Sequence, residues 1–405
     1  MKEIYKQLTK ATALVALFLM IGTNAWAKVE WIGTSITNFP TTGAQCNPST
    51  WYKIGSTGIS VKGPLIKYNS TNKCIDMGFV QGQNDPRGTF GFLKSPDQDR
   101  FVTLVFQTFK EKERVIVTEE TTDFILETAH SQGVNNVAGA GVSLTFEMKA
   151  DLEYEIRVSN TNTPHIKAVT VYSDDEILSL DETEAKSVNE GRISNERAGK
   201  LVLKLNRSLI GGIWNTFCVP MNVDADHLPI CDAVYTLNTY NSSDNTLTFT
   251  KVTDGLRANT PYLIKPTQNV TNIAFAGTIQ APAEAKATSN GLNFIGIYGW
   301  ENLYTEDHSK FVLRASDNKL VYPTSSGDAG RMKGFRAYFE WTGGGSVKDM
   351  NFIFDDTATG IITVENDIFQ ENGRIYSVDG RYISNSKENL SRGIYIQNGR
   401  KFIVK

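Results

Sequence analysis

The sequence predicts an all-β protein, built from two antiparallel β-sandwich or jelly-roll-like domains followed by a small C-terminal β-tail. Short alternating or β-branched runs, such as those at residues 100–106, 114–118 and 141–148, are separated by Gly, Asn, Asp and Ser. These runs recur at intervals of about 8 to 15 residues, which favours an antiparallel sandwich or barrel. In addition, no long window shows the spacing of apolar residues that is typical of an amphipathic helix.

Length and charge limit the possible functions. The chain has 405 residues, and at roughly 150 residues per domain this length predicts two or three domains. Lys and Arg number 41 against 44 Asp and Glu, for a net charge of −3. A chain of this charge has no basic field for a phosphate backbone, so nucleic acid is not an expected partner.

Residues 1–27 have the pattern of a secretory signal peptide. Three lysines precede an apolar run at residues 11–21, and small residues stand at Ala25 and Ala27. The alternative is a membrane anchor, but spanning a bilayer takes about 20 apolar residues and this run is near half that length. We therefore expect cleavage after Ala27, an extracellular or cell-surface location, and a mature chain without a transmembrane segment.

Residues 28–173 are predicted to form the N-terminal β-sandwich. The last two strand-like runs, at residues 152–158 and 166–172, faintly resemble the closing strands of galactose-binding-like jelly rolls. Aromatic side chains in this part could form a flat platform for a sugar ring, or could belong to the core. The candidates are Trp31, Trp51, Tyr52, Tyr68 and Phe92.

Cysteines and histidines give no strong signal for chemistry. The four cysteines are Cys46, Cys74, Cys218 and Cys231, which permit one disulfide in each half of the chain, other connectivities, or free thiols. The four histidines are scattered and none begins a His-Glu-x-x-His motif; they are His130, His165, His227 and His308. The sequence also has no nucleophile elbow, phosphate loop or dinucleotide fingerprint. We therefore predict no catalytic residue, no metal ligand and no cofactor.

The acidic stretch at residues 174–198 is predicted to be a solvated boundary that leads into the second domain. It carries eight acidic side chains, diluted by Lys186, Arg192 and Arg197. A calcium site is the alternative, but calcium needs oxygen ligands at set spacing and no Asp-x-Asp-x-Asp-Gly loop is present.

Three motifs lie within residues 199–358, the predicted second domain. They are Trp-Asn-Thr-Phe-Cys-Val-Pro at 214–220, Leu-Arg-Ala-Asn-Thr-Pro-Tyr-Leu-Ile-Lys-Pro at 256–266, and Phe-Arg-Ala-Tyr-Phe at 335–339. In order and spacing they resemble a β-rich module of exported, surface-associated Bacteroidota proteins. The resemblance covers roughly residues 176–355 and implies a scaffold without a catalytic motif, so that Lys265 and Arg336 have structural roles. This chain has Asn259 and Thr260 where a Gly usually precedes the Pro-Tyr pair.

Residues 359–405 are predicted to form a C-terminal β-tail. A strand enters Asp379–Gly380, and a Gly-Ile-Tyr strand then leads to Asn398–Gly399 and a final Val-Lys. Both Asx-Gly pairs are tight-turn signals. The pattern resembles the C-terminal sorting-type domain of Bacteroidota proteins that use type IX secretion. The alternative is a terminal β-meander that acts only as a stabilising cap.

Three functions remain open from these observations. The first is a non-catalytic surface protein of adhesin or carbohydrate-binding type, with a glycan or a surface protein as partner. The second is a glycan-degrading enzyme with an unrecognised pair of carboxylates, which would lie about 5 to 10 Å apart in a cleft. The third is a purely structural surface component. Of these, the first is the prediction.

We expect the secreted protein to begin at Lys28, because the Ala25 and Ala27 positions fit the small-residue requirement of signal peptidase. Amino-terminal sequencing of the secreted product checks this. A product that still begins at Met1 would contradict it.

Overall fold

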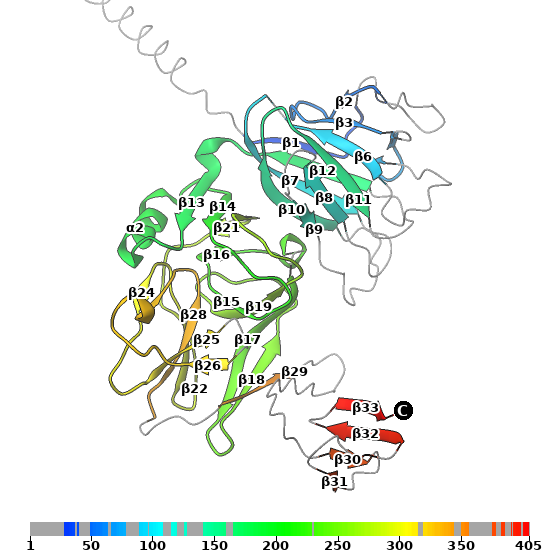
Figure 1. Ribbon diagram of the computed structural model, residues 1–405. Helices are drawn as coiled ribbons and strands as arrows, with labels where there is room; N and C mark the ends of the chain where they lie inside the picture. Colours follow the sequence, from blue (N-terminus) through cyan, green and yellow to red (C-terminus); the bar gives the residue numbers. More distant parts are fainter. Residues whose placement is uncertain are drawn as a thin grey trace, which may run out of the picture.

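The computed structural model is mostly strand and confirms the all-β class (Figure 1). Strands account for 52% of the structure and helices for 7%. The finer sandwich or jelly-roll arrangement stays a prediction. The structure describes residues 28–36, 39, 49–63, 66–77, 89–95, 97–107, 115–119, 125–127, 141–158, 165–228, 231–314, 319–343, 350–355, 375–377, 382–384, 390, 392–397 and 400–404. The predicted signal peptide, Cys46 and His130 lie outside these residues.

Two six-stranded antiparallel sheets make up the N-terminal part. The first has the order β10-β7-β12-β5-β4, with β1 also paired to β12. Its strands are β1 (Val29–Ile32), β4 (Lys67–Asn69), β5 (Cys74–Asp76), β7 (Arg100–Gln107), β10 (Gly141–Met148) and β12 (His165–Val171). The second has the order β2-β3-β6-β11-β8-β9. Its strands are β2 (Tyr52–Lys53), β3 (Ser60–Lys62), β6 (Thr89–Lys94), β8 (Val115–Glu119), β9 (Ile125–Glu127) and β11 (Glu153–Val158).

The buried faces of these two sheets contribute to one hydrophobic core. Leu104 and Phe106 of β7 and Ile166 of β12 come from the first sheet, and Leu93 of β6 and Ile156 of β11 from the second; all five are fully buried. Val102, Leu104 and Phe106 alternate along β7 into this core, as the side-chain period of two requires, while Phe101 and Thr103 are buried on its other face. A bulge between Ile166 and Ala168 interrupts the pairing of β12 with β7.

The acidic stretch is folded, so the prediction of a solvated segment is wrong. It contains the 3-10 helix η1 (Asp174–Glu176), strand β13 (Ile177–Asp181) and helix α2 (Lys186–Glu196), the one α-helix among the described residues. Strand β13 pairs in parallel with β14 (Val202–Asn206), which pairs antiparallel with β20 (Ile273–Ala276). Asp174, Asp175 and Glu196 are exposed, while Leu178 and Leu180 of β13 enter the core.

Helix α2 is held by an amide rather than by an apolar stripe. Its buried residues are Asn189 and Ile193. The Asn189 side chain donates hydrogen bonds to the carbonyl oxygens of Asp181, at 2.8 Å, and Tyr298, at 2.7 Å. Because one of the two buried residues of α2 is an asparagine, the helix lacks the apolar periodicity from which helices are predicted.

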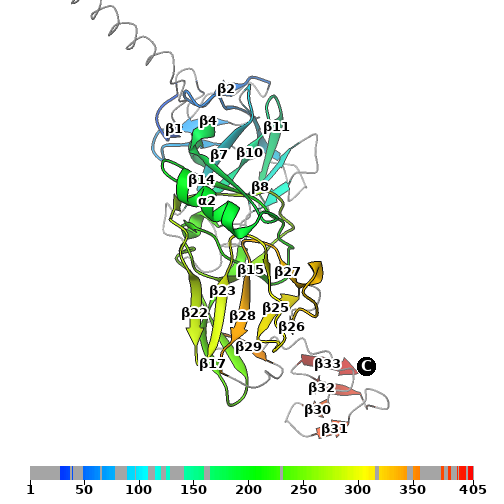
Figure 2. The same ribbon diagram turned by 90° about the vertical axis from the view of Figure 1, so that its left-hand side faces the viewer.

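Two five-stranded sheets follow in the second part (Figure 2). One has the order β15-β19-β17-β18-β29, with β15 (Asn215–Phe217), β17 (Cys231–Asn241), β18 (Thr246–Lys251), β19 (Tyr262–Pro266) and β29 (Asn351–Asp355). The other has the order β22-β23-β28-β25-β26, with β22 (Ala285–Ser289), β23 (Leu292–Gly296), β25 (Lys310–Arg314), β26 (Lys319–Val321) and β28 (Ala337–Trp341). Two-stranded sheets pair β16 (Met221–Asn222) with β21 (Thr278–Ile279) and β24 (Glu301–Asn302) with β27 (Arg331–Met332).

Aromatic side chains fill the core of these five-stranded sheets. The rings of Phe294 and Phe339 stack with centroids 4.5 Å apart, and Phe249 meets both edge-on. Trp214 stacks on Phe354 of β29 at the same centroid distance. Strand β29 pairs in parallel with β18, which lies about a hundred residues earlier in the sequence, so the last strand of the second part completes this sheet.

The three sequence motifs of the second part meet at one place. Thr216 of the first motif pairs with Leu263 of the second across β15 and β19. The amide of Cys218 donates to the carbonyl oxygen of Phe335, the first residue of the third motif, at 3.1 Å. The guanidinium of Arg207 donates to the carbonyl oxygens of both Thr216, at 2.6 Å, and Phe335. The motifs thus form one hydrogen-bonded unit.

Asn259, two residues before Pro261, adopts a left-handed backbone conformation. Asn259 has φ +58°, a conformation that Gly adopts without strain and Asn tolerates better than other residues. Its side-chain amide donates to the carbonyl oxygen of Ala281 at 3.0 Å. Asn is therefore well suited to this position of the turn.

Arg336 forms an ion pair with a buried carboxylate. It donates to Glu182 at 2.6 Å, and Lys333 donates to the other carboxylate oxygen of Glu182 at 2.9 Å. The side chain of Glu182 is 8% exposed. Two cations therefore compensate a buried carboxylate, which links the acidic stretch to the third motif. Lys265 lies 5.7 Å from the ring centroid of Trp214.

The N-terminal and second parts pack against each other. Phe101 and Tyr172 form a small buried cluster with Val202 and Ala276 of the second part. Lys204 reaches Glu147 across the same boundary at 3.4 Å. That residues 28–173 and 199–358 form separate domains, each able to fold by itself, stays a prediction.

The C-terminal tail contains a four-stranded antiparallel sheet of order β31-β30-β32-β33. The strands are β30 (Ile375–Ser377), β31 (Tyr382–Ser384), β32 (Gly393–Gln397) and β33 (Arg400–Val404). The predicted turns Asp379–Gly380 and Asn398–Gly399 lie outside the described residues. Gln397 pairs with Arg400, which leaves two residues to connect β32 and β33.

Replacing Arg207 by Met should lower the free energy of unfolding by about 2 to 5 kcal/mol, because two buried carbonyl oxygens lose their hydrogen bonds to the guanidinium. Chemical denaturation measures the change. Arg192→Met is the matched control, since Arg192 lies exposed on α2 and its replacement should change the free energy of unfolding by about 0.5 kcal/mol or less. Equal effects of the two replacements would contradict the role given to Arg207.

Candidate functional site

Two of the predicted platform aromatics belong to the core. Trp31 is 3% exposed, and its indole nitrogen donates to the carbonyl oxygen of Thr34 at 3.0 Å. Tyr68 is 8% exposed, and its hydroxyl donates to the carbonyl oxygen of Gly33 at 2.7 Å. The prediction that these two side chains contact a sugar is therefore wrong, because both rings are enclosed and both polar atoms are already hydrogen-bonded.

Trp51 and Tyr52 remain as partly exposed aromatics. Both are half-buried, at the edge strand β2 of the second sheet. The ammonium nitrogen of Lys62 lies 4.3 Å from the ring centroid of Trp51 and 2.8 Å from a carboxylate oxygen of Glu153. The Tyr52 ring contacts Phe39, with centroids 5.2 Å apart. We call Trp51, Tyr52, Lys62 and Glu153 together the Trp51 surface.

Phe92 lies in β6, and its side chain is outside the described structure. It therefore stays a prediction as a platform residue.

The predicted disulfides are not formed among the described cysteines. Cys74 and Cys218 are free thiols. Cys218 is fully buried, with its sulfur 3.9 Å from the hydroxyl of Tyr298, and burial raises the pKa of its thiol to about 12. A thiol in this environment is inert.

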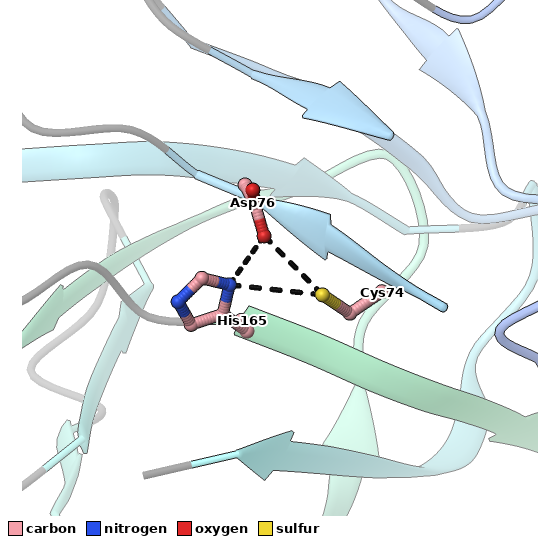
Figure 3. Close-up of side chains that lie close together, drawn as sticks. All are labelled: Cys74, Asp76 and His165. Atoms are coloured by element: carbon pink, nitrogen blue, oxygen red, sulfur yellow. Dashed lines mark hydrogen bonds and ion pairs between the residues drawn. The ribbon is translucent and has the colours of Figure 1, made fainter. Parts of the chain in front are cut away.

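A cluster that sequence reasoning did not predict brings together Cys74, Asp76 and His165 (Figure 3). Cys74 and Asp76 lie two residues apart on β5, so their side chains project from the same face, while Ile75 between them enters the core. His165 begins β12 and pairs with Asp76 across the two antiparallel strands. The strand pairing thus fixes the backbone positions of all three residues.

The three side chains converge on one another. The sulfur of Cys74 lies 3.2 Å from Oδ1 of Asp76 and 3.7 Å from Nδ1 of His165. Nδ1 of His165 is also hydrogen-bonded to Oδ1 of Asp76. Asn69 of β4 donates to the other carboxylate oxygen at 3.1 Å. Cys74 is fully buried, and the side chains of Asp76 and His165 are 7% and 13% exposed.

The electrostatics of the cluster favour a carboxylate beside a protonated thiol. Burial alone would raise the pKa of Asp76, but hydrogen bonds from His165, Cys74 and Asn69 outweigh it and hold that pKa below its ordinary value. Burial and the neighbouring Asp76 raise the pKa of the Cys74 thiol to about 12, although the positive charge of Lys167 opposes them.

This arrangement does not match a nucleophilic triad. In a triad the nucleophile and the carboxylate contact opposite nitrogens of the imidazole, and the nucleophile is activated. Here Cys74 and Asp76 both face Nδ1, and the thiol holds its proton. The cluster can instead act as a hydrogen-bonded network or as a set of ligands.

No protein-family model matches the chain, and no curated protein matches it either. Among the described residues, the structure has no helix with both the length and the apolar character needed to cross a bilayer.

Replacing Trp31 by Ala should lower the free energy of unfolding by about 3 to 5 kcal/mol, because it empties a core position. Trp51→Ala, which removes a half-buried ring, should cost clearly less. Denaturant titration of both variants compares them. A larger loss for Trp51→Ala would show that the two residues have been assigned to the wrong environments.

Proposed function

We propose that the protein is an exported, non-catalytic binding protein that acts outside the cell or on its surface, with a glycan or another surface component as ligand. The observation that carries this proposal is the Trp51 surface. The indole ring of Trp51 is partly exposed at an edge strand, with the cation of Lys62 and the carboxylate of Glu153 beside it, and the partly exposed phenol ring of Tyr52 follows it in the sequence. By contrast, Trp31 of the same part is enclosed in the core.

The chemistry of the Trp51 surface suits a sugar. Carbohydrates present apolar C–H faces that stack on aromatic rings, and hydroxyl groups that hydrogen-bond to charged side chains at the rim. Lys62 and Glu153 supply one donor and one acceptor group at this position. A small, half-exposed surface of this kind gives modest affinity at a single site.

The signal-peptide pattern and the sorting-type tail support an extracellular location, and the resemblance to surface-protein modules supports a scaffold in the second part. In this proposal the N-terminal part presents the ligand-binding residues, the second part holds them away from the attachment point, and the tail serves for export or as a cap.

A glycan array probed with the purified protein identifies the ligand class. Exchanging Trp51 and Tyr52 together for Ala should then weaken binding of the best glycan by about tenfold or more, equivalent to about 1.4 kcal/mol. Tyr322→Ala is the matched control, because Tyr322 is an exposed aromatic residue of the second part, 45% accessible, and its loss should leave binding unchanged.

The outcomes separate the alternatives. An altered far-ultraviolet circular dichroism spectrum of the double variant would show that Trp51 and Tyr52 are needed for folding. Turnover of a polysaccharide by the purified protein would favour the glycan-degrading enzyme. Failure to bind any glycan or any cell-surface fraction would favour a purely structural component.

A further inference from the structure

We propose that Cys74, Asp76 and His165 form a binding site for one divalent transition-metal ion, with zinc as the best match. This inference is independent of the Trp51 surface, and it replaces the prediction that the chain has no metal ligand. It rests on the types of ligand atom, on their spacing, and on the way in which the two strands hold them.

The ligand atoms are those that zinc prefers. Cysteine sulfur, histidine nitrogen and carboxylate oxygen are its ordinary protein ligands, whereas magnesium and calcium take oxygen almost exclusively. All three ligand atoms of the cluster lie within 4.8 Å of one another. A mixed set of one sulfur, one nitrogen and one oxygen therefore selects against the hard cations.

The spacing is also suitable. With zinc–sulfur and zinc–nitrogen bonds of about 2.3 and 2.0 Å, a tetrahedral site places these two ligands about 3.5 Å apart. The sulfur of Cys74 and Nδ1 of His165 are 3.7 Å apart, and the sulfur and Oδ1 of Asp76 are 3.2 Å apart. Asp76 and His165 are directly hydrogen-bonded, so metal binding must move these two groups slightly apart.

The surrounding structure holds the ligands in place. Cys74 and Asp76 project from one face of β5, and β12 presents His165 opposite Asp76. The amide of Asn69 donates to Oδ2 of Asp76, which leaves Oδ1 directed at the other two ligands. Such an outer hydrogen bond fixes the orientation of a metal-binding carboxylate.

Charge balance permits a metal ion at this buried position. A thiolate and a carboxylate together carry two negative charges, which a divalent cation neutralises while the imidazole remains neutral. Zinc binding replaces the thiol proton of Cys74 and releases it to solvent, as is general for thiolate ligands. Three protein ligands leave a fourth position for a water molecule.

Metal analysis of the purified full-length chain without a histidine tag tests the proposal. After treatment with a chelator, incubation with zinc and desalting, we expect about one zinc ion per chain. Cys74→Ser and His165→Gln should each abolish this retention. Cys231→Ser is the matched control, because it makes the same exchange at a cysteine of the second part, outside the cluster, and should retain the metal.

Cobalt gives a second measurement that does not depend on the variants. Titration of the wild-type protein with Co²⁺ should produce the near-ultraviolet charge-transfer band of a thiolate–cobalt bond, and excess zinc should remove it. Magnesium should produce no change in the thermal midpoint, whereas zinc should raise it. Absence of the band in a folded protein would overturn the proposal, even if a variant failed to fold.

Two further outcomes would also overturn it. Peptide mapping without reductant that finds Cys74 disulfide-bonded to Cys46 would show that the sulfur is not available to a metal. Zinc retention that is equal in the wild type and in folded Cys74→Ser would show that the metal binds elsewhere, and that the cluster is a hydrogen-bonded network only.

Discussion

The buried guanidinium of Arg207 is the contact on which the second part of the molecule depends. It is 1% exposed and packs 4.9 Å from the ring centroid of Phe217. Two hydrogen bonds to backbone carbonyl oxygens from separate motifs offset part of the cost of burying this cation, although its Nε has no hydrogen-bond partner among the described residues. Phe335, which supplies one of these oxygens, has φ +58°, an unfavourable conformation for an aromatic residue. The amide of Phe335 donates to the carbonyl oxygen of Ile297, and its own carbonyl oxygen accepts hydrogen bonds from Arg207 and Cys218. These contacts keep Phe335 in its unfavourable conformation.

Much of the fold could be predicted because strands are recognisable in a sequence from alternating apolar and polar residues. The run at residues 100–106 lies in β7, and the run at 141–148 forms β10. Helix α2 and strand β13 could not be predicted in the same way. The segment is acidic, and its buried anchor is Asn189, a residue that sequence reasoning assigns to loops. The hydrogen bond from Asn189 to Tyr298 joins residues 109 positions apart, and no local pattern contains that information.

The candidate sites show the same limit. Nothing in the sequence around Trp31 and Trp51 distinguishes an enclosed ring from a half-exposed one, since burial is decided by the strands that pack above them. Cys74 and Asp76 form a visible Cys-Ile-Asp alternation, which could have indicated two polar groups on one strand face. His165, however, lies 91 residues from Cys74 and arrives only through the antiparallel pairing of β5 and β12. Neither the composition nor a local sequence motif indicates that these residues lie close together in the fold.

The parallel pairing of β18 with β29 has a consequence for the order of folding. Phe354 supplies the ring on which Trp214 stacks, and β29 is the last strand of the second part. Until residue 355 is available, Trp214 lacks its stacking partner and β18 presents an unpaired edge. Closing so long a loop is entropically costly, and it becomes favourable only when the aromatic core forms at the same moment. The second part therefore remains incomplete while the chain is being synthesised, and most of the 405 residues must emerge before its sheet can close.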